Sequence, residues 1–154
     1  MGKKIKLGIL GGGGDSLIGV LHSVASSMFD KFEVVGGVFN TDKNESIRFA
    51  EEIGISTNHI YANLDELIEK EKSLPEEERI KVVSVLTPNF LHFSMAKQLL
   101  ENGFHVICEK PMTTTLEEAK ILKKTSDKAG KVFAVTYTYT GYPMVRQMRE
   151  MITS

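Results

Sequence analysis

The chain has 154 residues, of which 42% are hydrophobic and 25% are charged, enough for one globular domain with a buried core. The net charge is -1 and the basic residues are scattered, so the sequence predicts neither DNA nor RNA as a partner. No segment approaches the roughly 18 consecutive apolar residues of a membrane-spanning helix, so no membrane partner is expected. Cys108 is the only cysteine, which excludes an intrachain disulfide and favours a reducing compartment such as the cytoplasm.

Apolar segments rich in Val and Ile alternate with segments of helical periodicity along the chain. This order is typical of repeated βα units and predicts an α/β fold, a doubly wound and mainly parallel sheet with helices on both faces. The expected strands cover residues 5–10, 32–39, 59–61, 80–86, 105–108 and 132–136. The expected helices cover residues 17–28, 44–53, 64–71, 90–102, 116–129 and 143–152. Residues 69–79 are charged and contain few apolar side chains, so they are expected to form a solvated connection.

Residues at the ends of two expected helices match the preferences of helix caps. Side chains that accept hydrogen bonds from free backbone amides favour the N-cap position, and we expect this role for Asn89 and for either Thr114 or Thr115. Glycine favours the left-handed conformation that ends a helix, and we expect it at Gly103 and Gly130.

A run of glycines follows the first expected strand and opens the first helix. Glycines there permit positive φ angles and let backbone amides approach a pyrophosphate at the positive end of the helix. In the usual G-x-G-x-x-G spacing, Gly11 and Gly13 are followed by Ser16, while Gly19 comes late, so the loop is expected to be slightly enlarged. The alternative is a flexible turn that holds no ligand.

Asn40 stands at the end of the second strand, where an acidic residue usually holds the ribose hydroxyls of NAD. The residues that follow include Asp42, Lys43 and Arg48, so the pocket suits either a ribose or the 2′-phosphate of NADP. The alternative is a polar turn at 40–44 that only caps the next helix.

Two further motifs follow the fourth and fifth strands, where open sheets place ligands at their carboxyl edge. Thr87-Pro88-Asn89 leads to His92, which is expected one turn into a helix, either beside a ligand or as a half-buried histidine whose polar atoms are satisfied. Lys110, in Glu109-Lys110-Pro111, can orient a substrate hydroxyl, stabilise negative charge or relay a proton, although such a tripeptide is also common in surface turns. The other histidines lack metal-ligand spacing, so no metal is expected.

Taken in order, the glycine loop, the Thr87 motif and Glu109-Lys110-Pro111 resemble the Gfo/Idh/MocA family of oxidoreductases. This resemblance implies a Rossmann-like NAD(P)-binding domain at residues 1–140, with 141–154 starting the connection to a C-terminal substrate domain that is absent from this chain. It implies that Lys110 is the catalytic lysine. The implied contacts to NAD or NADP are Gly11, Gly13, Ser16, Leu17 and Ile18 at the pyrophosphate, Asn40 and Thr41 at the ribose, Thr87, Pro88, Asn89 and His92 along the dinucleotide wall, and Glu109 and Lys110 at the nicotinamide.

The function implied is hydride transfer to or from a sugar, polyol or cyclic alcohol, catalysed by the full-length protein and not by this fragment alone. A small carbohydrate-like molecule is the expected substrate. Apolar surface around Tyr142, Met144 and Met148 is expected to promote formation of a homo-oligomer. The competing hypothesis is a non-enzymatic sensor or scaffold that binds the dinucleotide, and a third is an α/β domain whose glycine loop stays empty.

Overall fold

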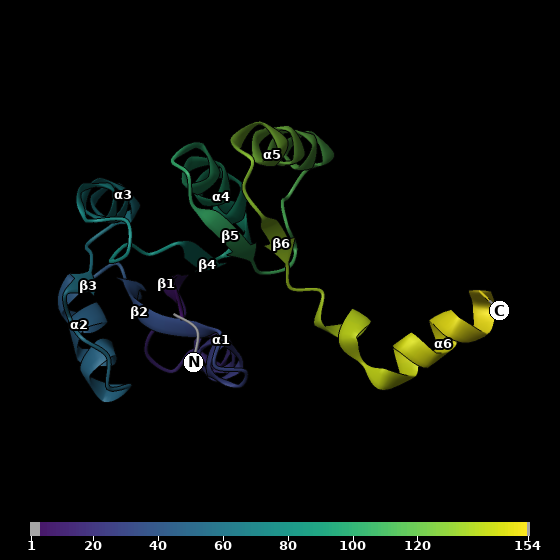
Figure 1. Ribbon diagram of the computed structural model, residues 1–154, viewed down its shortest axis with the longest axis horizontal. Coiled ribbons are helices and arrows are strands. Elements are labelled where there is room, and N and C mark those ends of the chain that lie inside the picture. Colours follow the sequence, from purple (N-terminus) through teal and green to yellow (C-terminus); the bar gives the residue numbers. More distant parts are fainter. Residues whose placement is uncertain (1–3, 154) are drawn as a thin grey trace.

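The computed structural model describes residues 4–153 and contains one parallel sheet (Figure 1). Its six strands run in the order β3-β2-β1-β4-β5-β6, which confirms the predicted doubly wound α/β fold. The chain steps outward from β1 to β3, returns to the centre at β4 and then steps outward in the opposite direction. The strands are β1 Ile5–Gly11, β2 Phe32–Val38, β3 His59–Ile60, β4 Val82–Leu86, β5 His105–Cys108 and β6 Phe133–Val135.

The helices cover both faces of the sheet, since right-handed crossovers in opposite directions place helices on opposite faces (Figure 1). Helices α1 and α2 lie on one face and α3, α4 and α5 on the other. Every expected helix is present. The helices are α1 Leu17–Ser27, α2 Lys43–Glu52, α3 Leu64–Ser73, α4 His92–Glu101, α5 Leu116–Ala129 and α6 Pro143–Thr153, with short 3-10 turns η1 Asn89–Leu91 and η2 Thr138–Gly141.

The core consists of two apolar clusters, one on each face of the sheet. In β4, Val83 and Val85 pack against helices α3 to α5, while Leu86 belongs to the cluster beside α2. All five residues of β4 are buried, as expected of a central parallel strand covered on both faces. The larger cluster includes Leu67, Leu99, Leu100 and Leu122 from the helices, and the smaller one includes Ile9, Phe39, Phe49 and Ile60.

The caps of α5 are confirmed, whereas the cap expected for α4 is wrong. Thr115 forms a complete capping box with Glu118, and Gly130 ends α5 with a φ angle of 61°. Asn89 instead begins the turn η1, and α4 starts at His92 without a side-chain cap. The physical reason is that η1 already engages backbone groups ahead of α4, because the Leu91 amide donates to the Pro88 carbonyl. Gly103 has the expected left-handed conformation, with a φ angle of 88°.

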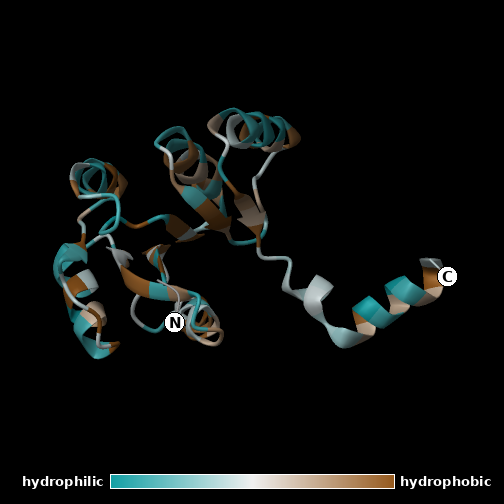
Figure 2. Cartoon of the chain, in the orientation of Figure 1, coloured by the Kyte–Doolittle hydropathy of each residue, from teal (hydrophilic) through white to brown (hydrophobic). Residues whose placement is uncertain are grey.

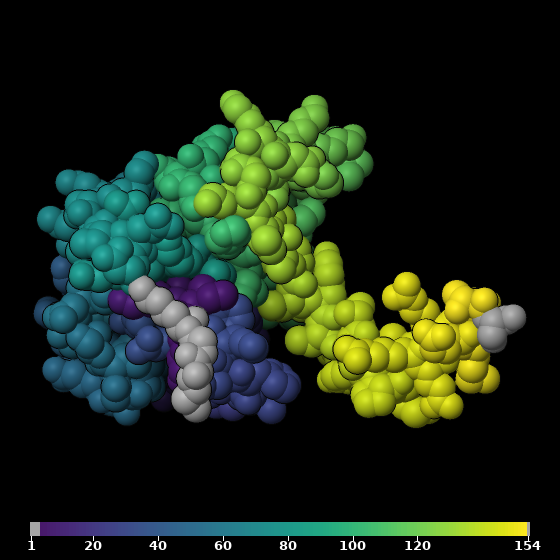
Figure 3. All heavy atoms as spheres, viewed as in Figure 1, coloured from purple at the N-terminus to yellow at the C-terminus, as the bar shows by residue number. Residues whose placement is uncertain are grey.

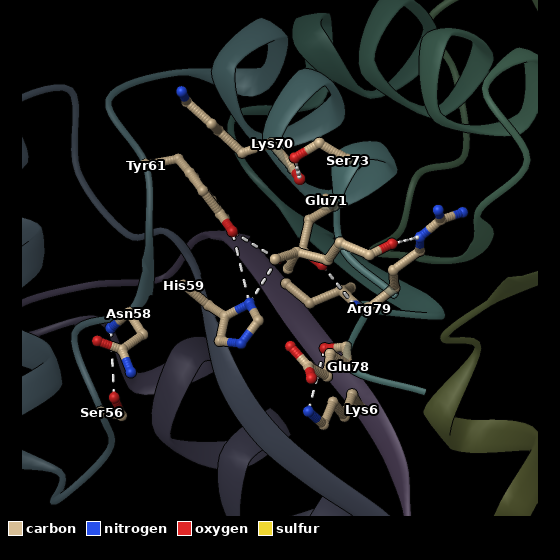
Figure 4. Close-up of polar contacts among 12 residues, drawn as sticks. Lys6, Ser56, Asn58, His59, Tyr61, Lys70, Glu71, Ser73, Glu78 and Arg79 are labelled. Atoms are coloured by element: carbon tan, nitrogen blue, oxygen red, sulfur yellow. Dashed lines mark hydrogen bonds and ion pairs between the residues drawn. The ribbon is translucent and has the colours of Figure 1, made fainter. Parts of the chain in front are cut away.

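The solvated connection expected at 69–79 is wrong for its first part, because α3 extends to Ser73 and the Glu71 side chain is fully buried, whereas residues 75–78 are exposed as expected. Figure 4 shows its carboxylate meeting three groups from neighbouring segments. Its oxygens accept hydrogen bonds from the Tyr61 hydroxyl and the Ile80 amide, and the His59 Nδ1 atom lies 2.6 Å away. The buried carboxylate therefore joins α3 to the starts of β3 and β4, at the amino edge of the sheet.

Helix α6 projects away from the rest of the molecule after the turn η2 (Figures 1 and 3). It begins at Pro143 as expected, and none of its residues is buried. Figure 2 shows apolar and polar residues alternating around it.

The sheet also has an apolar hollow of about 550 Å³, lined by residues that include Ile5, Phe32, Ile107 and Val132. Within residues 4–153, no helix is both long and apolar enough to cross a lipid bilayer.

Candidate functional site

A cavity of about 530 Å³ lies at the carboxyl ends of β1, β2 and β4. Five residues predicted from three separate motifs line it together: Gly11, Asn40, Thr41, Thr87 and Pro88. Most of the remaining wall is apolar, with contributions from Leu86, Phe90 and Met95 among others. A slot with apolar walls and a few polar groups at its mouth suits a flat aromatic ring joined to a polar sugar, such as an adenosine.

The glycine loop is a backbone cradle with no room for side chains at its centre. Gly11 and Gly12 have φ angles of 80° and 70°, which L-residues with side chains rarely adopt. A Cβ atom built on Gly19 would lie 1.8 Å from the Gly12 carbonyl oxygen, so helix α1 contacts the loop backbone directly. A Cβ atom on Gly13 would lie 2.7 Å from the Phe39 carbonyl oxygen. The bare backbone and the start of α1 therefore fit a pyrophosphate, whose approach requires this absence of side chains.

The third small residue of the loop is Gly19 rather than Ser16. Gly19 is the buried residue of α1, and its contact with Gly12 gives the close packing of helix on strand that this position provides. Ser16 is the N-cap of α1, and its side chain makes no capping hydrogen bond. The Leu17 side chain is exposed, whereas the Ile18 side chain packs against the smaller core cluster.

The turn after β2 caps helix α2. The Asn40 side-chain oxygen accepts from the Asp42 amide at 3.0 Å, and Asp42 in turn accepts from the Asn44 amide at 2.8 Å. The two nearby cations each have an acidic partner, Lys43 with Glu66 and Arg48 with Glu45. Asp42 therefore caps α2 as the capping alternative described, Lys43 and Arg48 form ion pairs instead, and Asn40 and Thr41 line the cavity.

His92 is fully buried and not half-buried as expected, and it connects the two motif loops from within. Its Nδ1 atom lies 2.7 Å from the Pro111 carbonyl oxygen, and its Nε2 atom lies 2.9 Å from the Thr87 carbonyl oxygen. Both ring nitrogens thus face backbone acceptors and not the cavity. His92 therefore supports the loops that carry Thr87 and Lys110, while Pro88 and Asn89 are exposed.

Lys110 and Glu109 have opposite environments although they are adjacent. The Lys110 side chain is exposed, and within residues 4–153 its ammonium has no hydrogen-bond or ion-pair partner. The Lys110–Pro111 peptide bond is cis. Glu109 is 8% exposed. Burial raises the pKa of its carboxyl group, but hydrogen bonds from Thr136, His22 and the Lys110 amide outweigh burial and hold that pKa below its usual value.

Two sets of contacts in this region were not predicted from the sequence: the packing of Gly19 against Gly12, and the contacts of His22 and Thr136 with Glu109. The sequence did carry a signal for the first contact, because the interval between Gly12 and Gly19 places a second glycine in the first turn of the helix. His22 and Thr136 gave no such signal, because their meeting point at Glu109 joins segments far apart in the sequence.

The buried thiol of Cys108 lies next to Glu109. Burial, followed by the nearby negative charge of Glu109, raises the pKa of Cys108 to about 12, so its thiol is not a ready nucleophile. Among residues 4–153, no cluster of three or more His, Cys, Asp or Glu side chains is placed to hold a metal ion.

Comparison with known proteins gives matches along nearly the whole chain. A profile of the oxidoreductase family with an NAD-binding Rossmann fold matches residues 5–137. The uncharacterized oxidoreductase YfiI of Bacillus subtilis (strain 168) is 34% identical over 151 residues, which cover 97% of this chain and 38% of that protein. Glucose-6-phosphate 3-dehydrogenase of the same organism is 32% identical over 147 residues, which cover 96% of this chain and 37% of that protein.

A solved structure agrees with these matches. An inositol dehydrogenase homolog from Azotobacter vinelandii, complexed with NADH and myo-inositol, superposes with a TM-score of 0.92 at 36% identity, covering 98% of this chain and 39% of that one. The present chain thus spans less than half the length of the relatives it matches. The chain belongs to the Gfo/Idh/MocA family of oxidoreductases, and its fold is the family's NAD-binding Rossmann domain.

Proposed function

We propose that this chain is the cofactor-binding part of an NAD(P)-dependent dehydrogenase that acts on a hydroxyl group of a sugar, polyol or cyclic alcohol. The observation that carries the proposal is that the glycine cradle, the apolar cavity and Lys110 all follow strand ends at one edge of the sheet. The named relatives support the substrate class, since one is a glucose-6-phosphate 3-dehydrogenase and another was solved with myo-inositol.

Each part of the dinucleotide has a proposed partner. The amides of Gly11, Gly13 and residues 16–18 hold the pyrophosphate at the start of α1. Asn40 and Thr41 bind the adenosine ribose, and the apolar cavity holds the adenine ring. The wall formed by Thr87, Pro88 and Asn89 lies along the dinucleotide toward Lys110. Glu109 holds the Lys110 amide next to the nicotinamide, and His92 supports both loops from within the protein.

Lys110 has the proposed catalytic role. When bound, the nicotinamide supplies the acceptor or donor of a hydride. The exposed Nζ atom of Lys110 meets the substrate oxygen: as an amine it accepts the hydroxyl proton while a carbonyl forms, and as an ammonium it donates a hydrogen bond to that carbonyl. The reverse direction returns the proton from the same nitrogen.

The wider setting is also proposed. Residues 1–140 form the cofactor domain, and 141–154 begin the connection to a substrate domain. The single buried cysteine supports a cytoplasmic location. The exposed apolar side chains of α1 and α6 support self-association, and the scattered charge supports neither nucleic acid nor membrane as a partner.

Titration of the chain with NAD and with NADP, by calorimetry, tests the binding site. The informative variants are Ser16→Asp and Ser16→Asn, because both residues are good N-caps of nearly equal shape and differ in charge. A carboxylate at this position repels a pyrophosphate, so Ser16→Asp weakens binding by about tenfold or more, which is about 1.4 kcal/mol. Ser16→Asn keeps the affinity within about threefold.

The outcomes separate the hypotheses clearly. Binding that is lost in Ser16→Asp alone supports the site, and preference between the two cofactors then identifies the natural one. Equal affinity in both variants places the pyrophosphate elsewhere. Absence of binding to either cofactor by the unmodified chain contradicts the proposal.

A further inference from the structure

The carboxylate of Glu109 is the meeting point of three segments of the chain. Its Oε2 atom accepts from the backbone amide of Lys110 at 3.1 Å. Its Oε1 atom accepts from the Thr136 hydroxyl and lies 3.2 Å from the Nε2 atom of His22. Glu109 was expected to flank the nicotinamide, yet both of its oxygens are engaged inside the protein.

The chemistry of this contact fixes the proton on His22. An ionised carboxylate only accepts hydrogen bonds, so the His22 Nε2 atom must carry a hydrogen. The side chains of His22 and Glu109 are 13% and 10% exposed, so water competes weakly for the bond. A hydrogen bond to a charged group contributes more to stability than one between neutral groups.

His22 lies on the helix that the glycine loop positions. Gly19 contacts the Gly12 backbone, and His22 follows three residues later, so the two residues share one face of α1. A displacement of the loop therefore moves His22. The segment on the other side of the contact carries Lys110, whose ammonium has no anchor of its own within residues 4–153. The Glu109 carboxylate therefore holds the backbone amide of Lys110 from one side, while the bond between His92 and the Pro111 carbonyl holds the loop from the other.

We propose that His22 is a positioning residue which, through Glu109, couples the glycine-loop helix to the backbone of Lys110. The proposal deepens the function proposed above and rests on it for its biological meaning. A dinucleotide that settles on the start of α1 would, by this link, set the position of the lysine at the other end of the site. Such support from behind the reacting group is what fixes catalytic geometry.

The first test needs neither a ligand nor a variant. The ¹⁵N spectrum of the 154-residue chain at neutral pH reports whether His22 Nε2 is protonated. A protonated Nε2 with a downfield proton is the result expected for a bond to a carboxylate. A bare Nε2 nitrogen overturns the proposal even if every variant misfolds.

The second test compares hydrogen exchange of the Lys110 amide in three variants. His22→Leu removes the donor while keeping the bulk, and exchange is expected to accelerate about tenfold or more through local opening. His22→Gln restores a side-chain N–H and keeps exchange within about threefold of the native rate. The control is Ser26→Ala on the same helix, whose hydroxyl bonds only the Ser23 carbonyl. Equal exchange in native and His22→Leu protein overturns the proposal.

The third test adds ADP, which carries the pyrophosphate but no nicotinamide that could touch Lys110, and follows the Lys110 amide signal. In the native chain the signal shifts on binding, and in His22→Leu the shift is lost while the dissociation constant changes less than about threefold. A shift that persists in His22→Leu overturns the coupling. If the native chain binds neither ADP nor NAD, the proposed function fails, whereas the first two tests still decide whether the link exists.

Discussion

Lys110 is the residue to which we assign the proposed chemistry of the site. It is exposed at the carboxyl edge of the sheet, and its neighbours Glu109 and Pro111 are both held by other parts of the chain. An exposed ammonium on a fixed backbone suits a group that must meet a substrate entering from outside the domain. The long, flexible side chain of Lys110 can extend toward a substrate, while the hydrogen bonds of the loop fix the backbone from which it extends.

We expect Lys110→Ala, in a protein that carries the downstream domain of its relatives, to lower kcat by about 100-fold or more. The dissociation constant of the cofactor should change by less than about threefold, because the pyrophosphate and ribose contacts remain. Lys110→Arg is the matched control, since it keeps the charge but cannot release a proton at neutral pH. Steady-state kinetics combined with cofactor titration measure both effects. Normal turnover of Lys110→Ala would exclude a catalytic role.

Helix α3 shows how one inward-facing charge holds several elements together. Glu71 contacts His59, Tyr61 and the Ile80 amide near its last turn (Figure 4). Burial raises the pKa of Glu71, but hydrogen bonds from His59, Tyr61 and Ile80 outweigh burial and hold that pKa below the usual value of 4.5. A lowered pKa in the folded state stabilises the protein fully above the unfolded value, and this stabilisation is lost as the pH falls below 4.5.

We expect Glu71→Gln to reduce the free energy of unfolding at pH 7 by about 2 kcal/mol, since the charge-assisted hydrogen bonds are weakened. Below pH 4.5 the difference from the native chain should shrink as the native carboxylate takes up protons. Urea denaturation at several pH values measures both effects, and Glu69→Gln on the exposed side of the same helix is the control. A constant difference at every pH would show that Glu71 does not titrate as described.

The elements themselves follow closely from the sequence, because strand and helix periodicities are local properties. The apolar run of β4 and the capping residues of α5 both reveal their structure within a few positions. The burial of Glu71 was not predicted, because nothing in the sequence distinguishes a buried glutamate from the exposed charged residues around it. The bond between His22 and Glu109 was missed for a different reason, since 87 positions separate the partners and only the fold brings them together. Within the site, the strand-end motifs were predictable and their mutual support was not.

The whole molecule leaves a large apolar surface uncovered. Helix α1 exposes Leu17, Leu21 and Val24, its C-cap Met28 is also exposed, and α6 stands apart from the sheet (Figure 3). Exposed apolar area of this extent drives association in water.

We therefore expect the chain to self-associate at high protein concentration. Sedimentation velocity should give an average mass above that of one chain, and the double variant Leu21→Lys and Val24→Lys should lower it. Lys at two solvent-facing helical positions preserves the fold while it repels a second copy. The control is Lys120→Glu on α5, which changes an exposed charge without altering apolar surface. A concentration-independent mass of one chain would contradict the expectation.

The Glu71 network and the glycine cradle occupy opposite edges of the same sheet. Selection for heat resistance can therefore act on one edge while selection for cofactor or substrate preference acts on the other. Substitutions that strengthen the contacts of Glu71 at the amino edge act away from the cavity at the carboxyl edge, so an engineer can raise the melting temperature first and then alter specificity in a more tolerant background.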